Sequence, residues 1–435
     1  MPDLNLKIFK ENFKHFSRAF AYRNYRLYFT GQAISLIGTW MQRIAMSWLV
    51  YRLTGSAWLL GLVGFMSQIP SLLLVPVVGV IVDSQDRLRI IIITQTLAMI
   101  QAFILAALIL TNTVQVWHII LLSLFLGLIN AFDQPARQTF VQDMVEKKED
   151  LSNAIGMNSL LFNGARLIGP SLAGILIAIV GEGWCFFLNG VSYIAVIIAL
   201  FMMRIKKQEV RSIHGNFINN FLEGARYSFG FEPIRFILLN IFIIGLMGLP
   251  FLTLMPIFAR DILHGGPATM GFLMASVGIG AIIGAIMFAM RRTLRGIGRS
   301  IAYSTAVFSV GLILFSHMNL MWLSMIFLAV IGLGQITSFT SSNTSLQTMA
   351  DDDKRGRVLA FYNASFMGAA PFGSLISGGL ANSIGAPNTV LIGGIISLLG
   401  AALFYWKLPN LTKQVRPIFI KMGVEYPNDL NITGV

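Results

Sequence analysis

The sequence has few charged residues and only one cysteine. Asp, Glu, Lys and Arg make up 12% of the 435 residues, whereas 55% of the residues are hydrophobic. A chain of this length cannot build a water-soluble surface from so few charges, so a soluble protein is excluded. The single cysteine, Cys185, excludes an internal disulfide and a cysteine-cluster metal site. The composition therefore indicates an integral membrane protein.

The hydrophobic residues are gathered in long runs rather than in short alternating segments. About 20 apolar residues are needed to cross the hydrocarbon core of a bilayer as a helix. Because the bilayer offers no water to backbone groups, such runs must be helical, and a barrel would show short alternating strands instead. We therefore predict an all-α membrane protein with about twelve transmembrane helices. The expected spans are 28–52, 57–82, 90–111, 115–136, 153–180, 184–203, 235–259, 269–290, 300–317, 320–346, 357–383 and 387–406.

Lysine and arginine residues gather on one side of the predicted spans. That side collects 28 of the 32 Lys and Arg residues, and it includes both ends of the chain. Because cytoplasmic loops retain positive charge, both termini are expected to be cytoplasmic. This topology and the anionic lipid headgroups account for the net charge of +13, so nucleic acid is not an expected partner.

The residues before the first span lack the hydrophobic core and cleavage site of a secretory signal, so the first span is expected to act as its own signal. Within residues 1–27, Leu6 and Phe9 recur at helical spacing, with Lys7 and Lys10 on another face. This pattern predicts a cytoplasmic amphipathic leader that lies on the membrane surface. A disordered basic leader is the alternative.

The two halves of the sequence resemble each other at a constant offset of 205 residues. The segment that starts at Gln142 aligns without gaps with the segment that starts at Gln347, and Gly79 corresponds to Gly284. Each half contains about six spans, an even number, so both copies enter the membrane from the same side. Two such bundles leave a central cavity that can open to each side in turn, which is the architecture of a carrier. The expected parts are a leader (1–27), an N-terminal six-helix bundle (28–203), a cytoplasmic linker (204–234), a C-terminal six-helix bundle (235–406) and a cytoplasmic tail (407–435).

The loop after the second span carries the first family resemblance. Its segment GVIVDSQDRLR resembles the signature loop of the major facilitator superfamily, which implies that fold for nearly the whole chain. A carboxylate at a helix end can bond helix termini and cations, so the loop is expected to act as a gating latch on the cytoplasmic side. Ser84 replaces the arginine that usually follows the acid, which leaves the partner of the latch open, and a solvated loop acid is the alternative. The matching residues are Gly79, Asp83, Arg87 and Arg89.

Small residues in the fifth span form a second resemblance. The segment GMNSLLFNGARLIGPSLAG resembles the fifth-helix motif of antiporters and exporters in the same superfamily. Small residues let helix backbones meet closely and a proline bends a helix, so a tight, bent seam between the halves is expected. The resemblance favours export, and ordinary small-residue packing is the alternative. The motif residues are Gly156, Ala165, Gly169, Pro170 and Gly174, with Ala165 and Ala173 in place of glycine.

Two further segments are similar to one branch of the superfamily. GTWMQRIAMSWLVYRLTGS in the first span and FVQDMVEKKEDLSNAIGMNS before the fifth resemble the enterobactin-exporter-like branch. This resemblance implies a secondary active transporter in the inner (plasma) membrane of a bacterium, monomeric by the default of the fold. It would export a siderophore or a drug-like amphipathic compound from the cytoplasm. An importer or a lysophospholipid flippase on the same fold is the alternative.

Two arginines, Arg43 and Arg166, lie within predicted spans. A guanidinium in the hydrocarbon region is costly unless it is paired or faces water. Both are therefore expected to line the cavity and to bind an anionic or catechol-bearing cargo. The alternative is that they satisfy backbone carbonyls at a bent helix or bind Asp133. Gln42 and Gln68 are further candidates for substrate binding, although amides as often connect helices.

Acidic residues are missing from the middle of the spans, which limits how transport can be coupled to protons. Asp133, near the end of the fourth span, is the best candidate for proton coupling, with Arg137 one turn later as its partner. A plain intrahelical ion pair is the alternative. The sequence shows no phosphate-binding loop, nucleophile–base pair or metal-ligand cluster, so we expect neither an enzyme nor a cofactor nor a bound metal.

Overall fold

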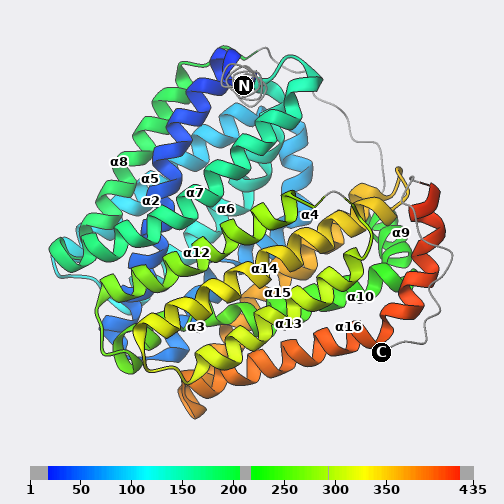
Figure 1. Ribbon diagram of the computed structural model, residues 1–435. Helices are drawn as coiled ribbons and strands as arrows, with labels where there is room; N and C mark the ends of the chain where they lie inside the picture. The colour runs from blue at the N-terminus through cyan, green and yellow to red at the C-terminus, as the bar shows by residue number, and fades with distance from the viewer. Residues whose placement is uncertain (1–17, 206–216, 292, 422–435) are drawn as a thin grey trace, which may run out of the picture. The chain divides into compact units, whose positions relative to one another are not determined.

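The computed structural model describes residues 18–205, 217–291 and 293–421 (Figure 1). Over these ranges the chain is helical and contains no β-strand, so the predicted all-α class is confirmed. In chain order the elements are η1 (Arg18–Ala21), α2 (Arg23–Thr54), α3 (Ala57–Met66), α4 (Ile69–Ser84), α5 (Arg87–Leu110), α6 (Val116–Met144), α7 (Lys148–Val180), α8 (Glu182–Phe201), α9 (Phe217–Gly230), α10 (Glu232–Ile243), η2 (Ile244–Gly248), η3 (Leu249–Leu252), α11 (Met255–Ile257), η4 (Phe258–Ile262), α12 (Pro267–Ala289), α13 (Ile297–Ser316), α14 (Met321–Met349), α15 (Arg355–Ile384) and α16 (Ala386–Lys421).

Among the described residues, ten helical segments are long and apolar enough to cross a membrane. The other two expected spans fall within α2 and α15, which have 32 and 30 residues. At about 1.5 Å per residue, both helices are longer than the hydrocarbon core is thick. They are less apolar than the other spans because α2 carries arginines and α15 carries many small and polar residues.

Two of the expected spans are interrupted near prolines. The span expected at 57–82 consists of α3 and α4, because the chain turns at Ser67 and a new helix begins just before Pro70. Proline has no backbone N–H, so it fits the first turn of a new helix. The span expected at 235–259 passes from α10 into short π and 3-10 segments, where Pro250 and Pro256 remove backbone donors.

The chain divides into two compact units. Unit 1 comprises Met1–Leu49 and Leu73–His214, and unit 2 comprises Val50–Leu72 and Gly215–Val435. The continuous helix α2 therefore contributes to both units, because its last turn is grouped with unit 2 together with α3. The division into a leader, two six-helix bundles, a linker and a tail stays a prediction. Of the leader, linker and tail, residues 1–17, 206–216 and 422–435 lie outside the described ranges.

In unit 1, α2 packs closely against α7 and α8. A Cβ on Gly38 of α2 would lie 2.5 Å from the Oδ1 of Asn189 on α8, and a Cβ on Gly169 of α7 would lie 2.5 Å from the Cβ of Trp40 on α2. These spaces are too small for a side chain, so the two glycines set how closely the helices meet. α5 packs between α6 and α8 in the same unit (Figure 1).

In unit 2, α14 packs against α12 and α13, and α13 also packs against α16 (Figure 1). α3 packs against α15 at a pair of glycines, where a Cβ on Gly61 would lie 2.9 Å from the Cα of Gly378. Tyr51, near the end of α2, donates a hydrogen bond to the carboxylate of Asp261. These contacts explain why the end of α2 and all of α3 are grouped with unit 2.

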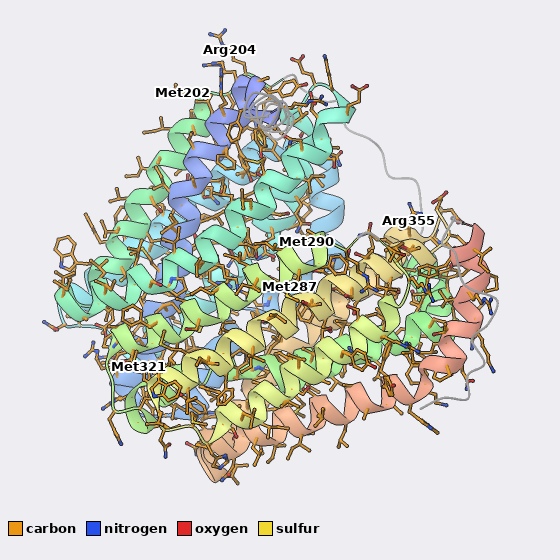
Figure 2. The ribbon with its side chains drawn as sticks, viewed as in Figure 1. Met202, Arg204, Met287, Met290, Met321 and Arg355 are labelled. Carbon is orange, nitrogen blue, oxygen red and sulfur yellow. The ribbon has the colours of Figure 1, made fainter. Side chains whose placement is uncertain are left out.

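Exposed apolar side chains cover the long helices. Met202 at the end of α8 is 50% exposed, and Met287 and Met290 at the end of α12 are 59% and 75% exposed (Figure 2). Soluble proteins rarely leave so much apolar surface in contact with water. These surfaces fit the lipid environment that the composition predicts.

Candidate functional site

Arg43 lies within α2, and its side chain is exposed. Its guanidinium carbon is 4.8 Å from the ring centroid of Trp40, one turn earlier on the same helix. Within the described ranges, no carboxylate lies within ion-pair distance of this guanidinium. An arginine in the middle of a spanning helix costs about 2.5–3.5 kcal/mol or more if it faces lipid. This face of α2 therefore suits water or a polar ligand.

Arg166 on α7 points to the same aromatic ring. Its half-buried side chain places the guanidinium carbon 5.9 Å from the Trp40 ring centroid, near enough to Arg43 for the two charges to repel each other. Phe162, one turn before Arg166, makes an edge-to-face contact with Trp40 at 5.7 Å and 69° and is 47% exposed. The structure thus brings both predicted arginines together. We call Trp40, Arg43, Phe162 and Arg166 the arginine site.

Gln42 lies next to Arg43 in the sequence but is buried among helices. It is 3% exposed. Its Nε2 donates to the Oε1 of Gln101 at 2.9 Å, and its Oε1 accepts from the Nδ2 of Asn189 at 2.6 Å. Both ends of its amide are therefore occupied by neighbouring helices. In this structure Gln42 connects helices, and its expected role in substrate binding stays a prediction.

Gln68, the second glutamine expected to bind substrate, makes a local hydrogen bond in this structure, and its role in binding stays a prediction. It is half-buried between α3 and α4, and its Nε2 donates to the backbone carbonyl of Gly64 at 3.1 Å. Gln68 belongs to unit 2, whereas the arginine site belongs to unit 1. The described contacts therefore give it a local role at the end of α3.

Asp133 is at the centre of a buried polar cluster in unit 1. It is 1% exposed, and its Oδ1 accepts hydrogen bonds from Thr94 at 2.8 Å and from Gln95 at 2.9 Å. Its Oδ2 accepts from Arg137, so the predicted pair is present. Arg137 also donates to the Oε1 of Gln32 at 2.6 Å. We call these five residues the Asp133 cluster.

Two amide atoms of the Asp133 cluster have no partner among the residues that the structure describes. They are the Nε2 of Gln32 and the Oε1 of Gln95, both buried. A buried amide atom without a hydrogen bond costs about 1–3 kcal/mol. The cluster therefore contains one amide donor, on Gln32, and one amide acceptor, on Gln95, that are not used by the described residues. A second arrangement of the side chains or a water molecule can bond to them.

The residues of the predicted latch loop lie within unit 1. Arg87 donates to both carboxylate oxygens of Asp143, at 3.2 and 3.3 Å. Asp86 caps α5, and Arg89 lies 3.7 Å from it. The side chain of Asp83 lies outside what the structure describes. The described contacts join the loop after α4 to the end of α6, and the gating role stays a prediction.

The residues of the fifth-helix motif differ in their surroundings. A Cβ on Gly156 would meet no atom within 4 Å, and the same is true of Gly79 in the latch loop. Gly169 instead lies against α2 of the same unit, and the expected seam between the halves stays a prediction. The other motif residues, Ala165, Pro170 and Gly174, are buried.

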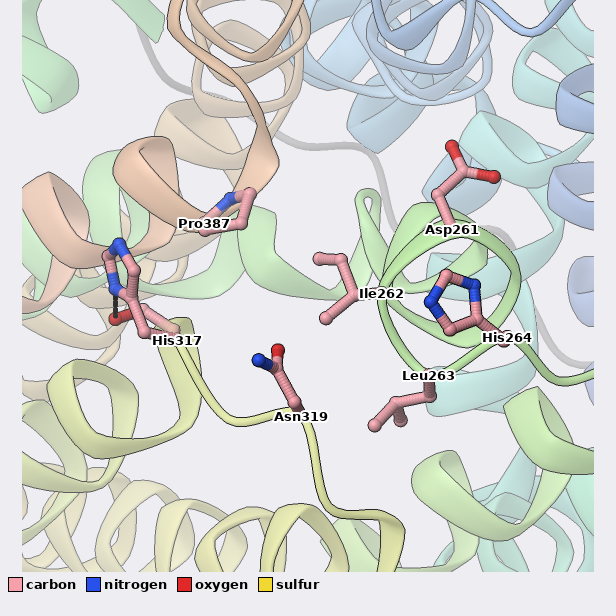
Figure 3. Close-up of a pocket in the computed structure, with 8 residues that line it drawn as sticks. Asp261, Ile262, Leu263, His264, His317, Asn319 and Pro387 are labelled. Atoms are coloured by element: carbon pink, nitrogen blue, oxygen red, sulfur yellow. Dashed lines mark hydrogen bonds between the residues drawn. The ribbon is translucent and has the colours of Figure 1, made fainter.

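Unit 2 contains an open pocket of about 450 Å³ (Figure 3). Its polar lining comes from Asp261, His264, His317 and Asn319, near the ends of η4 and α13. The Nδ1 of His317 shares a 3.0 Å hydrogen bond with Ser316 (Figure 3). No group of three His, Cys, Asp or Glu side chains in the described ranges could hold a metal ion. The arginine site, with two cations within spanning helices, is the stronger candidate for cargo binding.

Solved structures of known transporters share this fold. A structure of the nucleoside transporter NupG superposes with a TM-score of 0.68 at 13% identity, covering 88% of this chain and 98% of that one. A bacterial homologue of the human lysosomal transporter Spinster gives a TM-score of 0.69 at 12% identity, covering 90% and 98%. At these identities the similarity shows the fold alone.

Sequence relatives narrow the assignment. The staphyloferrin A transporter of Staphylococcus aureus is 25% identical over 386 residues, which cover 88% of this chain and 95% of the relative. Macrolide efflux protein A of Streptococcus pyogenes is 22% identical, covering 86% and 94%. The multidrug efflux pump Tap of Mycolicibacterium fortuitum is 24% identical, covering 86% and 93%. The family described as transmembrane secretion effectors matches residues 17–418. The chain therefore belongs to this family of major facilitator superfamily transporters.

Proposed function

We propose that the protein exports a small amphipathic anion from the cytoplasm by alternating access, in exchange for protons. The observation that carries this proposal is the arginine site, in which an exposed Arg43 and a half-buried Arg166 flank Trp40. The family description names secretion, and the relatives are named as transporters or efflux pumps for staphyloferrin A, macrolides and multiple drugs.

The charges of the arginine site favour an anionic cargo. Both guanidinium groups lie near the ring of Trp40, and a negative group between them would offset the repulsion of like charges. Guanidinium groups form paired, charge-assisted hydrogen bonds with carboxylates and similar planar anions. The exposed ring of Phe162 and the ring of Trp40 add apolar surface for the rest of the molecule. A compound with an anionic group and an apolar body fits both features.

In this proposal the Asp133 cluster exchanges the proton. Asp133 is buried within α6, and its carboxylate is held by Arg137, Thr94 and Gln95. Uptake of a proton would neutralise the carboxylate and weaken its bond to Arg137, which already has a second partner in Gln32. The cluster can then change between two hydrogen-bonded arrangements, as a switching element requires. A permanent ion pair is the alternative.

Transport into inverted vesicles tests the proposal. Purified protein is reconstituted and an acidic interior is imposed, and the uptake of a panel of siderophores and fluorescent drugs is measured. We expect gradient-driven uptake of anionic compounds by the wild type and its loss in Asp133→Asn. Full activity of Asp133→Asn would refute proton exchange at this residue. Preference for neutral or cationic compounds would refute an anionic cargo, and transport only in the opposite direction would indicate an importer.

The role of Arg43 is tested in the same vesicles. Arg43→Gln keeps a polar side chain but removes the charge, so we expect the KM for anionic cargo to rise about tenfold, the equivalent of one charge-assisted hydrogen bond. The KM for uncharged cargo should change less. Gln42→Leu serves as the control for lost helix packing at the neighbouring position: it should lower stability but affect charged and uncharged cargo equally, because Gln42 bonds to other helices. Equal effects of Arg43→Gln on charged and uncharged cargo would indicate a structural role.

A further inference from the structure

We propose that Gly169 makes the space for Trp40, and that Trp40 in this position keeps Arg43 and Arg166 close enough to bind one anion together. Trp40 and Gly169 are then positioning residues of the cargo site. The inference rests on the function proposed above, and it gives the fifth-helix motif a role inside unit 1.

The contact between Gly169 and α2 leaves no room for a side chain. A Cβ on Gly169 would lie 2.5 Å from the Cβ of Trp40 and 3.0 Å from the backbone oxygen of Ile37. Neither neighbour is the flexible end of a side chain, so neither can rotate away. A larger residue at this position must therefore move Trp40 and the α2 backbone away from α7. The glycine thus determines where the indole ring lies.

Trp40 is the group that both arginines of the site share. The ring centroid is 4.8 Å from the guanidinium carbon of Arg43 and 5.9 Å from that of Arg166. The distance between the two guanidinium carbons therefore cannot exceed the sum of these two distances. Like charges at this separation repel, whereas the electron-rich face of an indole attracts cations. The ring therefore offsets part of the repulsion and keeps both groups near one point before an anion arrives. Such preorganisation lowers the cost of binding.

Two other glycines of α7 do not share this property. Gly156 and Gly164 lie on the same helix, and a Cβ on either would meet no atom within 4 Å. General flexibility or small-residue packing of α7 therefore does not explain why glycine is needed at Gly169. Gly156 also belongs to the fifth-helix motif, so Gly156→Ala is a matched control for Gly169→Ala.

The first measurement is anion binding by thermal stabilisation of the full-length protein in detergent. Cys185 is the single cysteine and is buried, so a fluorogenic maleimide reports unfolding without any added label. Citrate is the probe, and its Kd follows from the rise of the unfolding temperature with concentration. We expect Trp40→Leu and Gly169→Ala to raise the Kd about tenfold and Trp40→Phe about threefold or less, because phenylalanine retains a weaker cation–π contact. Gly156→Ala should bind as the wild type does.

The second measurement follows the arginines without any anion. Phenylglyoxal modifies arginine side chains, and mass spectrometry gives the rate at Arg43 and at Arg166. We expect both rates to rise about threefold in Trp40→Leu and in Gly169→Ala, because the indole no longer covers the guanidinium groups. Gly156→Ala should leave both rates unchanged.

The outcomes separate this inference from the proposed function. If citrate fails to stabilise the wild type, binding of a small carboxylate by the arginines alone is refuted, the vesicle assay decides on an anionic cargo with an apolar body, and the labelling rates still decide whether Trp40 positions the arginines. Unchanged rates in Trp40→Leu and Gly169→Ala would overturn the inference, whatever citrate does. A lower unfolding temperature with unchanged citrate affinity and labelling would show that Gly169 serves helix packing alone, which also overturns it.

Discussion

Asp133 and Arg137 should contribute to stability as a pair and not as two independent residues. Asp133 is 1% exposed and the side chain of Arg137 is 21% exposed, and they lie one turn apart on α6. Asp133→Ala leaves a guanidinium without its carboxylate, and Arg137→Ala leaves a buried carboxylate without its cation. Each single substitution therefore lowers the free energy of unfolding by the cost of leaving the other charge without a counter-charge.

The expected size of this effect follows from burial. Removing one partner of a buried ion pair costs about 3–5 kcal/mol, and the partial exposure of Arg137 puts the expectation near the lower value, about 3 kcal/mol for each single variant. Thr94 adds little to the loss in Asp133→Ala because its single hydroxyl hydrogen can be donated to the backbone carbonyl of Ile91, 3.0 Å away, once Asp133 is gone. The double variant should lose about 3 kcal/mol as well, so the coupling energy is about 3 kcal/mol.

The free energy of unfolding is measured in detergent with the thiol of Cys185 as the reporter, for the wild type, both single variants and the double variant. The exposed pair of Asp352 and Arg355, 2.6 Å apart with side chains 91% and 40% exposed, is the control. Its coupling energy should be about 0.5 kcal/mol or less. If the double variant of the buried pair loses the sum of the two single losses, the two side chains do not act as a pair and the reasoning fails.

Three further substitutions test other contacts with the same unfolding assay. Gln42→Leu removes the amide between two helices and should cost about 2 kcal/mol, while a cost near zero would show that the amide bonds contribute nothing. Gly61→Leu forces α3 away from Gly378 and should cost about 3 kcal/mol, and wild-type stability would contradict the close contact. Tyr51→Phe removes one hydrogen bond to Asp261, whose side chain is 49% exposed, so the cost should be about 1 kcal/mol. A larger loss would show that this bond is better shielded from water than the structure indicates.

The helices and the two arginines could be predicted from the sequence because each follows from a strong physical constraint. The lengths of the hydrophobic runs must match the bilayer, so the expected spans fall on helices even where prolines interrupt them. A charge within such a run must find a partner or water. That constraint identified Arg43 and Arg166 without any knowledge of their neighbours.

The identity of those neighbours could not be predicted. Tryptophan and phenylalanine occur in many spans, so only the contacts with Arg43 and Arg166 distinguish Trp40 and Phe162 from lipid-facing rings. The role of Gln42 was ambiguous for the opposite reason. An amide can bind cargo or connect helices with equal chemical ease, and its bonds to other helices became visible only in the tertiary structure.

The repeat offset of 205 residues indicates that the second half of the chain has no counterpart of the tryptophan and the arginine that α2 contributes to the arginine site. At the positions that correspond to Trp40 and Arg43, the second half has Gly245 and Gly248. A Cβ on Gly373 of α15 would lie 2.4 Å from the backbone oxygen of Leu246, so the corresponding segments of unit 2 are packed backbone to backbone. In unit 1 these positions hold an aromatic ring and a cation, whereas in unit 2 the helix backbones pack too closely for such side chains.

The same asymmetry holds for the Asp133 cluster, and it makes α2 the natural link between cargo and proton. Asp133 and Arg137 correspond to Ser338 and Ser342, which are neutral. Gln32 of α2 binds Arg137, and Trp40 lies eight residues farther along the same helix, about 12 Å away at the helical rise per residue. In the proposed cycle, a proton on Asp133 changes how Arg137 holds Gln32. Because α2 is continuous between the two sites, the proposed cycle predicts that a shift of α2 at Gln32 is passed on to Trp40 and Arg43.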